Sequence, residues 1–259
     1  MDSKRKFKYI YGPVSSWRLG SSLGIDPLSF GKKVCSFDCV YCQIGKTEIS
    51  SVERKTYVDV VDIIDEIDSL PSCEIDYITF AGAGEPTLAA HLYHMIRAIK
   101  EIRKEKVAVI TNSSLLTQED VRGDLLLADM VVAKLDAPSD KLFKSINRPH
   151  SDITFGGVFH ALKSFRTQYK NRLALQIMFI DKNKDSAEKL AKCVREIKPD
   201  EVEINTPLRP CGVKPLSKRE IEEISKCFTG LNTVAVYDMP HKNVQPISDA
   251  DTLARRGKV

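Results

Sequence analysis

The stretch IDYITFAGAGEPTLAAHLYHMIRAIKEIRKEKVAVIT, residues 75–111, contains the pattern that decides the fold. It begins and ends with strand-like apolar runs, at residues 75–80 and 107–111. Between them the apolar residues recur at the spacing of one helix face: Leu88, Leu92, Met95, Ile96, Ile99 and Ile102. The stretch therefore predicts two parallel strands, because parallel neighbours need a crossover connection such as a helix.

The same alternation continues along the chain. Strands are expected at residues 23–25, 75–80, 107–111, 130–135, 173–180 and 202–205, with 234–237 as a further candidate. Helical patterns are expected at residues 60–67, 88–102, 155–169 and 187–197. About six β-α units predict an α/β fold, either a doubly wound sheet or a partial barrel. In both, functional residues lie on the loops that follow the strands.

Two helix starts carry capping signals. Thr117 with Asp120 and Ser217 with Glu220 each place an acidic residue three positions after a hydroxyl residue. This spacing is typical of a capping box, so helices are expected to begin after Thr117 and after Ser217.

Composition limits the class of protein. The chain has 259 residues, of which 42% are hydrophobic, enough to bury a large core. No apolar run is long enough to span a bilayer, and no secretory segment follows the charged start at residues 1–8. A cytoplasmic protein with no membrane partner is therefore expected. The odd number of cysteines, seven, argues for metal or thiol chemistry rather than a disulfide framework.

The positive charge is concentrated near the N-terminus. Residues 1–55 carry a net charge of +5, whereas the other 204 residues carry −1. One interpretation is a solvated basic surface. The other is a face for an anionic partner, such as nucleic acid or an acidic electron carrier.

The strongest local signal is Cys35-Ser-Phe-Asp-Cys39-Val-Tyr-Cys42. Three thiols within eight residues can surround one metal centre, and with no fourth cysteine nearby one coordination site stays open. A structural zinc site would need four ligands in paired clusters, and no second such motif is present. The spacing favours an open-site iron–sulfur cluster, and only one.

These residues resemble the radical S-adenosylmethionine (radical SAM) superfamily, whose signature CxxxCx(aromatic)C matches Cys35, Cys39, Tyr41 and Cys42. Together with Gln43 and residues 12–20, the stretch also resembles a subgroup related to wyosine-type tRNA synthetases. The resemblance covers residues 11 to about 210. It implies a partial (β/α)6 TIM-like barrel over residues 23–240. Residues 1–22 would then be a short N-terminal extension and residues 241–259 a C-terminal tail, which is polar from residue 248 and expected to be frayed.

Polar residues follow several predicted strands. Ala83-Gly84-Glu85 is similar to the GGE motif that binds the amino group of S-adenosylmethionine, although Gly-rich loops are more often only turns. By position in the superfamily, cofactor contacts are also implied for Asn112 and Ser113, which could instead only cap a helix.

The next two strands add further candidates. Lys134 and Asp136 share one side of their strand, either as cofactor contacts at the barrel mouth or as a structural ion pair. Met178, on the same strand face as Gln176, lies either near the adenine or in the core.

The last confident strand is followed by Arg209 and Cys211. Arg209 is a candidate for binding an anionic substrate group or a phosphate. Cys211 is either a hydrogen-atom donor or metal ligand at the barrel mouth, or more simply a bystander. Cys73, Cys193 and Cys227 are expected to be small buried apolar residues.

The resemblance implies an iron–sulfur oxidoreductase or transferase-like enzyme with one [4Fe-4S] cluster and S-adenosylmethionine as cofactors. A 5′-deoxyadenosyl radical would abstract hydrogen from a substrate, and a flavodoxin- or ferredoxin-like protein would supply the electron. The first substrate hypothesis is tRNA, because of the subgroup and the basic N-terminal segment. The alternatives are a protein, peptide or small metabolite, or a non-catalytic iron–sulfur redox or sensing protein. No catalytic residue for the substrate step is identified.

Overall fold

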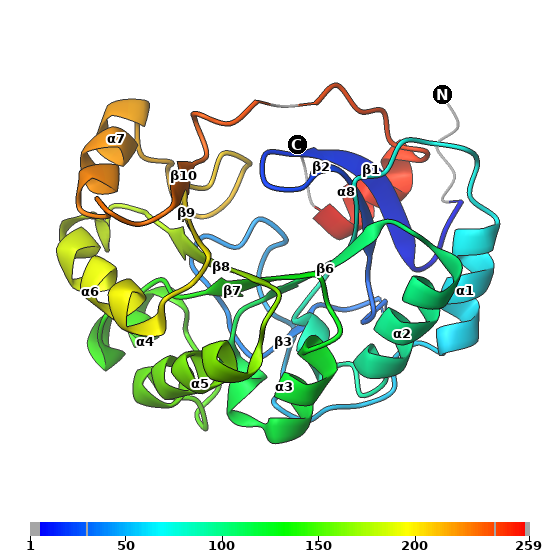
Figure 1. The fold of residues 1–259 in the computed structure, drawn as a ribbon, viewed down its shortest axis with the longest axis horizontal. Coiled ribbons are helices and arrows are strands. Elements are labelled where there is room, and N and C mark those ends of the chain that lie inside the picture. The colour runs from blue at the N-terminus through cyan, green and yellow to red at the C-terminus, as the bar shows by residue number, and fades with distance from the viewer. Residues whose placement is uncertain (1–5, 30, 241, 257–259) are drawn as a thin grey trace.

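The computed structural model describes residues 6–29, 31–240 and 242–256. Its main feature is an eight-stranded sheet that curls into a half-barrel, as Figure 1 shows. In sheet order the strands are β1 Ile10–Ser16, β2 Gly20–Ile25, β5 Tyr77–Phe80, β6 Lys106–Thr111, β7 Met130–Lys134, β8 Arg172–Met178, β9 Glu201–Asn205 and β10 Thr233–Ala235. Strand β1 pairs antiparallel to β2, and every other neighbouring pair is parallel. The predicted partial TIM-like barrel is therefore confirmed.

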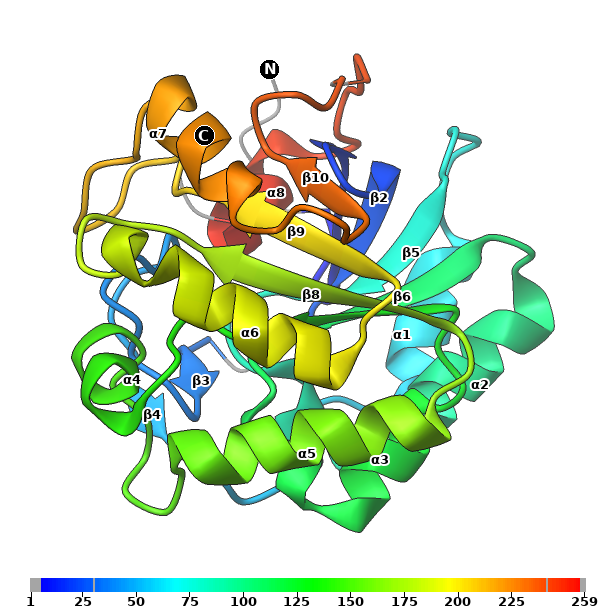
Figure 2. The ribbon, with the colours of Figure 1, turned by 60° about the vertical axis from the view of Figure 1, so that its left-hand side comes forward.

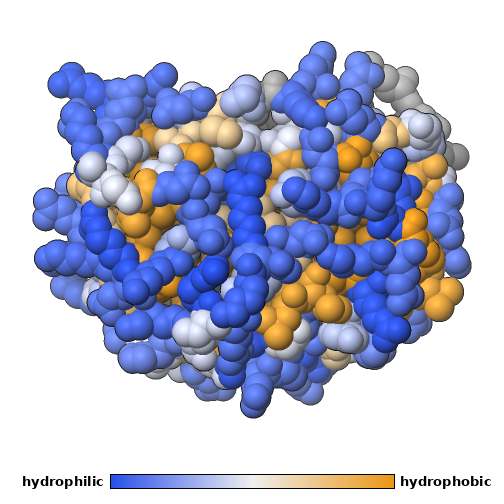
Figure 3. Space-filling view, viewed as in Figure 1, coloured by the Kyte–Doolittle hydropathy of each residue, from blue (hydrophilic) through white to orange (hydrophobic). Residues whose placement is uncertain are grey.

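Helices cover the outer side of the curled sheet (Figure 2). They are α1 Val60–Asp68, α2 Leu92–Ile102, α3 Glu119–Leu125, α4 Asp140–Ile146, α5 Phe155–Gln168, α6 Ala187–Ile197 and α7 Lys218–Lys226. Each buries apolar side chains, and in α2 these are Leu92, Met95, Ile96 and Ile99. One large apolar core fills the space between the helices and the sheet. The surface seen in Figure 3 is mostly hydrophilic, with apolar side chains visible in patches between polar ones.

The two ends of the chain pack together at one edge of the half-barrel. Strand β1 lies in the predicted N-terminal extension, and helix α8 (Asp249–Arg256) packs against it. The Asp251 carboxylate accepts the backbone N–H groups of Lys6 and Phe7, and the Thr252 hydroxyl accepts that of Gly12. The prediction of a frayed tail over residues 248–259 is therefore wrong for residues 249–256, because these polar side chains are buried partners of the backbone.

The two predicted helix starts have different outcomes. Ser217 and Glu220 form the expected capping box at the start of α7. The prediction for Thr117 and Asp120 is wrong, because residues 114–117 form a 3-10 turn and α3 begins after Gln118. Asp120 pairs instead with Arg54 at 2.5 Å, so an ion pair across the fold replaces the local cap.

The cysteine loop is attached to the sheet by its backbone. Short strands β3 (Val34–Cys35) and β4 (Ile49–Ser50) pair with each other, and Val34 also bridges to Gly84 after β5. The Glu85 N–H donates to the Val34 carbonyl at 3.2 Å. A Cβ atom on Gly84 would lie 1.9 Å from that carbonyl oxygen. The approach of the cysteine loop to β5 therefore requires glycine at position 84.

The inner face of the half-barrel carries a row of polar side chains. Lys134 Nζ lies 3.4 Å from the Gln176 amide oxygen, and Gln176 donates to Glu203 at 3.1 Å. Arg18 Nε lies 3.4 Å from the same Glu203 oxygen. Glu203 is fully buried, and this burial raises the pKa of its carboxyl from the ordinary 4.5 to about 7.

We predict that Glu203 makes folding stability fall as pH rises. The unfolded chain releases this proton at lower pH than the folded chain, so the free energy of unfolding falls between pH about 4.5 and about 7. Glu203→Gln should remove this contribution. Urea unfolding at several pH values checks it, and parallel pH profiles for the wild type and the variant would contradict it.

We also predict that Gly84→Ala destabilises the fold by about 1–3 kcal/mol, because the loop must move away from β5 to admit the methyl group. Gly123→Ala is the matched control. Gly123 is exposed in α3, and a Cβ there meets no other atom. This control should gain about 0.5–1 kcal/mol from helix propensity. Urea unfolding measures both; equal stability of Gly84→Ala and wild type would be the contrary result.

Candidate functional site

The cysteine loop is held over the strand ends by contacts to residues 146–148. Val40 N–H donates to the Ile146 carbonyl at 2.9 Å, and Asp38 N–H donates to the Asn147 carbonyl at 3.0 Å. Within the loop, Cys42 N–H donates to the Cys39 carbonyl at 3.0 Å and closes a turn. These bonds position three thiols on one short segment.

Each of the three sulfur atoms has a side-chain N–H donor. The Asn112 amide lies 3.6 Å from Cys35 Sγ, and the Asn147 amide lies 3.5 Å from Cys39 Sγ. The buried Lys33 ammonium lies 3.1 Å from Cys42 Sγ. Such donors stabilise thiolate charge and tune the potential of iron–sulfur clusters.

Without a metal, burial keeps two of these thiols protonated. Burial is the main cause that raises the pKa of Cys35 to about 12 and that of Cys39 to about 11. Metal binding would have to displace these protons, which couples occupancy of the site to pH.

The donor set fits an iron–sulfur cube better than a single metal ion. Over the described ranges, no three or more His, Cys, Asp or Glu side chains are grouped so as to hold one ion. All seven cysteines are free, as the odd count predicted. A closed zinc site needs four ligands, whereas three thiols on an iron–sulfur cube leave one iron open to a further ligand.

Asp136 connects the cysteine loop to the ends of strands β7 and β8. Its carboxylate accepts the Tyr41 hydroxyl, the Asn147 amide at 2.8 Å and the Met178 N–H at 2.8 Å. Lys134 Nζ lies 3.8 Å from this carboxylate and 4.6 Å from the centre of the Tyr41 ring. Burial, and then Asp136, raise the pKa of Tyr41, which therefore stays a neutral donor.

Glu85 connects the ends of strands β5 and β6. Its Oε1 accepts the N–H and the hydroxyl of Thr87, at 3.1 and 2.7 Å, and the Thr111 hydroxyl at 2.7 Å. Its Oε2 accepts one hydrogen bond, from Asn112 N–H at 2.7 Å. Burial raises the pKa of Glu85 in spite of these bonds. Ser113 has a positive φ of 71° and bonds through its hydroxyl to the backbone of Lys134.

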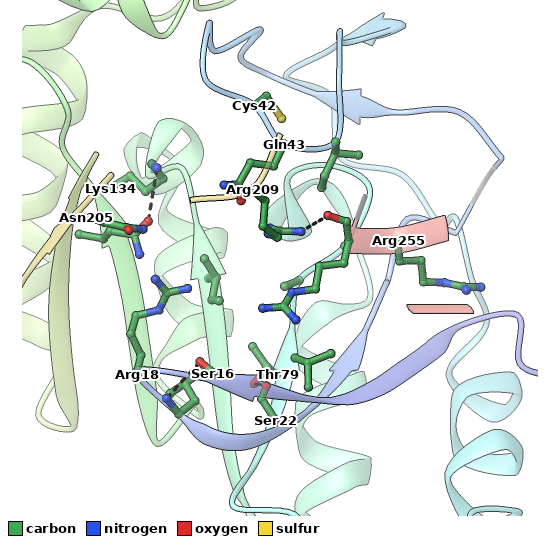
Figure 4. A pocket seen from close by; sticks show the side chains of 18 of the residues that line it. Ser16, Arg18, Ser22, Cys42, Gln43, Thr79, Lys134, Asn205, Arg209 and Arg255 are labelled. Carbon is green, nitrogen blue, oxygen red and sulfur yellow. Dashed lines mark hydrogen bonds between the residues drawn. The ribbon is translucent and has the colours of Figure 1, made fainter. Parts of the chain in front are cut away.

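A cavity of about 280 Å³ opens beside Cys42 at the mouth of the half-barrel (Figure 4). Of the predicted cofactor residues, Tyr41, Gly84 and Met178 line it. The others lie outside its wall: Ala83, Glu85, Asn112, Ser113 and Asp136. Most of these form the hydrogen bonds that hold the wall and the cysteine loop.

Other lining residues match or extend the sequence analysis. Arg209 lines the cavity as its strand-end position suggested, with Lys134 and Gln176. Cys211 donates to the Val213 carbonyl at 3.3 Å and packs against the apolar cluster that contains Tyr41 and Met178.

Sequence reasoning missed Arg18 and Arg256 as cavity residues. The sequence could have indicated Arg18, because this residue lies within residues 12–20, which resemble the wyosine-related subgroup. No such signal existed for Arg256, because only the tertiary packing of α8 brings it to the barrel mouth.

Relatives identify the family. The radical SAM superfamily matches residues 32–194. A UPF0026 protein of Methanocaldococcus jannaschii is 38% identical over 86% of this chain and 71% of its own length. A protein of Brachyspira hyodysenteriae named GTPase Obg is 38% identical over 97% of this chain, which spans only 38% of that protein. Over the residues that the structure describes, no helix has the length and apolarity needed to cross a membrane.

A solved structure shares the fold. Streptococcus suis SuiB bound to S-adenosylmethionine superposes with a TM-score of 0.61 at 15% identity, covering 80% of this chain and 49% of that one. The superfamily consists of enzymes and implies a [4Fe-4S] cluster and S-adenosylmethionine, so the enzyme expectation is confirmed. The finer resemblance to wyosine-type tRNA synthetases stays a prediction. The matched residues 32–194 include the cysteine loop and the strand ends that hold it, and by these matches the chain belongs to the radical SAM superfamily and groups with UPF0026 proteins.

Proposed function

We propose that this protein cleaves S-adenosylmethionine reductively at a [4Fe-4S] cluster held by Cys35, Cys39 and Cys42. The observation that carries the proposal is the placement of three donor-stabilised thiols on one short loop, whose Cys42 lines a cavity at the mouth of the half-barrel. When bound and reduced, the cluster supplies one electron that breaks the sulfonium C–S bond, and the resulting 5′-deoxyadenosyl radical abstracts hydrogen from a substrate.

The residues of this chain position the cofactor and exclude water. Gly84, Tyr41 and Met178 provide wall surface beside Cys42, and Met178 is 7% exposed. Glu85 Oε2 accepts one protein donor and keeps a lone pair for the cofactor's ammonium group. We assign supporting roles to Ala83, Asn112, Ser113 and Asp136, which hold these groups in place.

Lys33 is the basic residue that contacts a thiol. Its ammonium donates a hydrogen bond to the Gly45 carbonyl at 2.6 Å and lies 3.1 Å from Cys42 Sγ. A buried positive charge there would offset the negative charge of a cluster with three thiolates. At least part of the basic excess of residues 1–55 therefore serves the cluster.

The partners of the reaction are also proposals. A reduced cluster needs a flavodoxin- or ferredoxin-like donor. A tRNA substrate is supported by the sequence resemblance, but of the N-terminal basic residues Lys4 and Arg5 lie outside the described residues, and Lys6 and Lys8 do not line the cavity. Because Cys42 lines the cavity, we expect the reacting part of the substrate to enter this cavity through the barrel mouth.

The main test is metal loading followed by turnover. Anaerobically reconstituted protein should hold about four irons per chain and, with dithionite, convert S-adenosylmethionine to 5′-deoxyadenosine. Cys35→Ala, Cys39→Ala and Cys42→Ala should each lose both properties because each removes a thiol ligand. Iron analysis and chromatography of the nucleoside measure them.

Matched cysteine variants serve as controls for this test. Cys73→Ala, Cys193→Ala and Cys227→Ala should keep both iron and turnover, since these half-buried thiols lie elsewhere. Stoichiometric zinc without iron uptake would contradict the cluster. Iron loading without any 5′-deoxyadenosine would favour a redox or sensing protein instead.

A second test concerns Glu85. Glu85→Gln should weaken binding of S-adenosylmethionine about tenfold, because a hydrogen bond to a charged acceptor is stronger than one to a neutral amide. Calorimetry on the iron-loaded protein measures the affinity, and the iron content should not change.

Thr111→Val is the control for the Glu85 test. It removes one hydrogen bond to the same carboxylate but keeps the charge. It should lower stability and leave cofactor affinity nearly unchanged. If both variants weaken cofactor binding equally, Glu85 acts only as a support for the cavity wall.

A further inference from the structure

The walls of the cavity beside Cys42 are strongly positive. Lysine and arginine side chains line it, namely Arg18, Lys134, Arg209, Arg255 and Arg256, and among the described residues no Asp or Glu lines it. Lys134 is paired with Asp136 at 3.8 Å. Arg255 is paired with Asp26 at 4.0 Å and with Asp251 at 3.7 Å. The other three side chains are those of Arg18, which pairs with Glu203 at 3.4 Å, and of Arg209 and Arg256.

These three arginines also line a second cavity of about 500 Å³. The two cavities share Ser16, Arg18, Gln43, Asn205, Arg209 and Arg256. The arginines therefore lie where one cavity adjoins the other. Figure 4 shows Arg18 and Arg209 reaching the cavity from opposite sides.

These guanidinium groups form few hydrogen bonds and ion pairs within the described residues. Arg209 donates to the Arg256 carbonyl, and Arg256 donates to the Ser15 carbonyl at 3.5 Å. Within the described part of the chain neither forms an ion pair with a carboxylate. Arg18 pairs with Glu203 at 3.4 Å, yet its Nε and Nη1 atoms are buried without a hydrogen-bond partner.

Burial and mutual repulsion act against the charge of this arginine cluster. The pKa of Arg209 falls to about 10, first through burial and then through the charge of Arg256. Burial also lowers the pKa of Arg256, and Arg18 adds to the effect. All three arginine side chains are partly buried. Like charges held close together in such a site repel one another, and an anion bound between them would offset that repulsion.

S-adenosylmethionine is a poor candidate for that anion. It carries one carboxylate and two positive groups, the ammonium and the sulfonium, so it would add positive charge to the cavity. A phosphate monoester carries a charge of about −1.5 to −2 at neutral pH and has oxygens that match the fork of a guanidinium. The excess of guanidinium over carboxylate therefore suits a phosphate better than a single carboxylate.

We propose that Arg18, Arg209 and Arg256 form an anion subsite that binds the phosphate group of a small phosphorylated substrate. This assignment rests on the proposed radical SAM function, since it names the substrate class of the same cavity. A phosphate held there places the rest of the substrate either toward Cys42 or in the second cavity, beside Trp17.

The test uses inorganic phosphate as the probe, titrated by calorimetry into the full-length, iron-loaded protein with S-adenosylmethionine present. Ionic strength is held constant with chloride. Arg209→Gln and Arg256→Gln should weaken phosphate binding about tenfold or more. Arg209→Lys should weaken it less, because the charge remains but the planar fork is lost. The Arg209→Lys variant also allows the test if the Gln variants fold poorly, because it keeps the charge and most of the side-chain volume.

Arg219→Gln is the matched control, since Arg219 is an exposed arginine on α7 away from both cavities. It should bind phosphate like the wild type. Affinity for S-adenosylmethionine should change less than threefold in Arg209→Gln. If that variant loses the cofactor instead of phosphate, the arginines hold the cofactor's carboxylate and the proposal is wrong.

Two other outcomes would also overturn the subsite. One is a wild-type protein that does not bind inorganic phosphate. The other is an RNA stem-loop whose binding depends on Arg209 while phosphate has no effect. Formation of 5′-deoxyadenosine by the wild type is measured separately. Arginine-dependent phosphate binding without that product would reject the proposed function and leave the subsite standing.

Discussion

The close backbone contact between the cysteine loop and the end of strand β5 is the constraint on which the rest of the site depends. The Val34 carbonyl lies so near Gly84 that no side chain fits between them. This contact aligns the loop with the strand ends, where Glu85 and Asp136 can bond to neighbouring segments. A loop of three thiols would otherwise be a flexible surface segment.

Buried carboxylates do much of the positioning in this structure. Glu85 joins the ends of β5 and β6, and Asp136 joins the cysteine loop to β7 and β8. Both are nearly inaccessible to solvent, and donors surround both. Removing the carboxylate would leave buried donors without partners, so a structural role and a cofactor role can coexist in one residue. Only measurements of binding and stability together separate the two roles.

The half-barrel differs from a closed barrel in what its interior contains. A small apolar cluster fills part of the inner face and consists of Leu19, Ala108, Met130, Val132 and Ala174. Toward the mouth the interior is polar, and the ends of the chain add Arg18 and Arg256 to it. Strand β1 forms one edge of the curled sheet, and α8 packs against it (Figure 1). Residues of the β1–β2 turn and of α8 thus contribute to the site as well as to the edge of the fold.

The sequence alone indicated the α/β class, the alternation of strands and helices from residue 57 onward, the cysteine loop and the strand-end motifs, but not strand β1. These depend on local periodicity and short spacing, which a linear chain displays directly. It could not show that α8 is ordered, that Thr117 does not cap α3, or that the Glu85 carboxylate bonds to Thr111 and Asn112. Those outcomes depend on partners far away in the chain. Arg18, Arg209 and Arg256 are the clearest case, because only packing of both chain ends on the barrel brings these charges to one place.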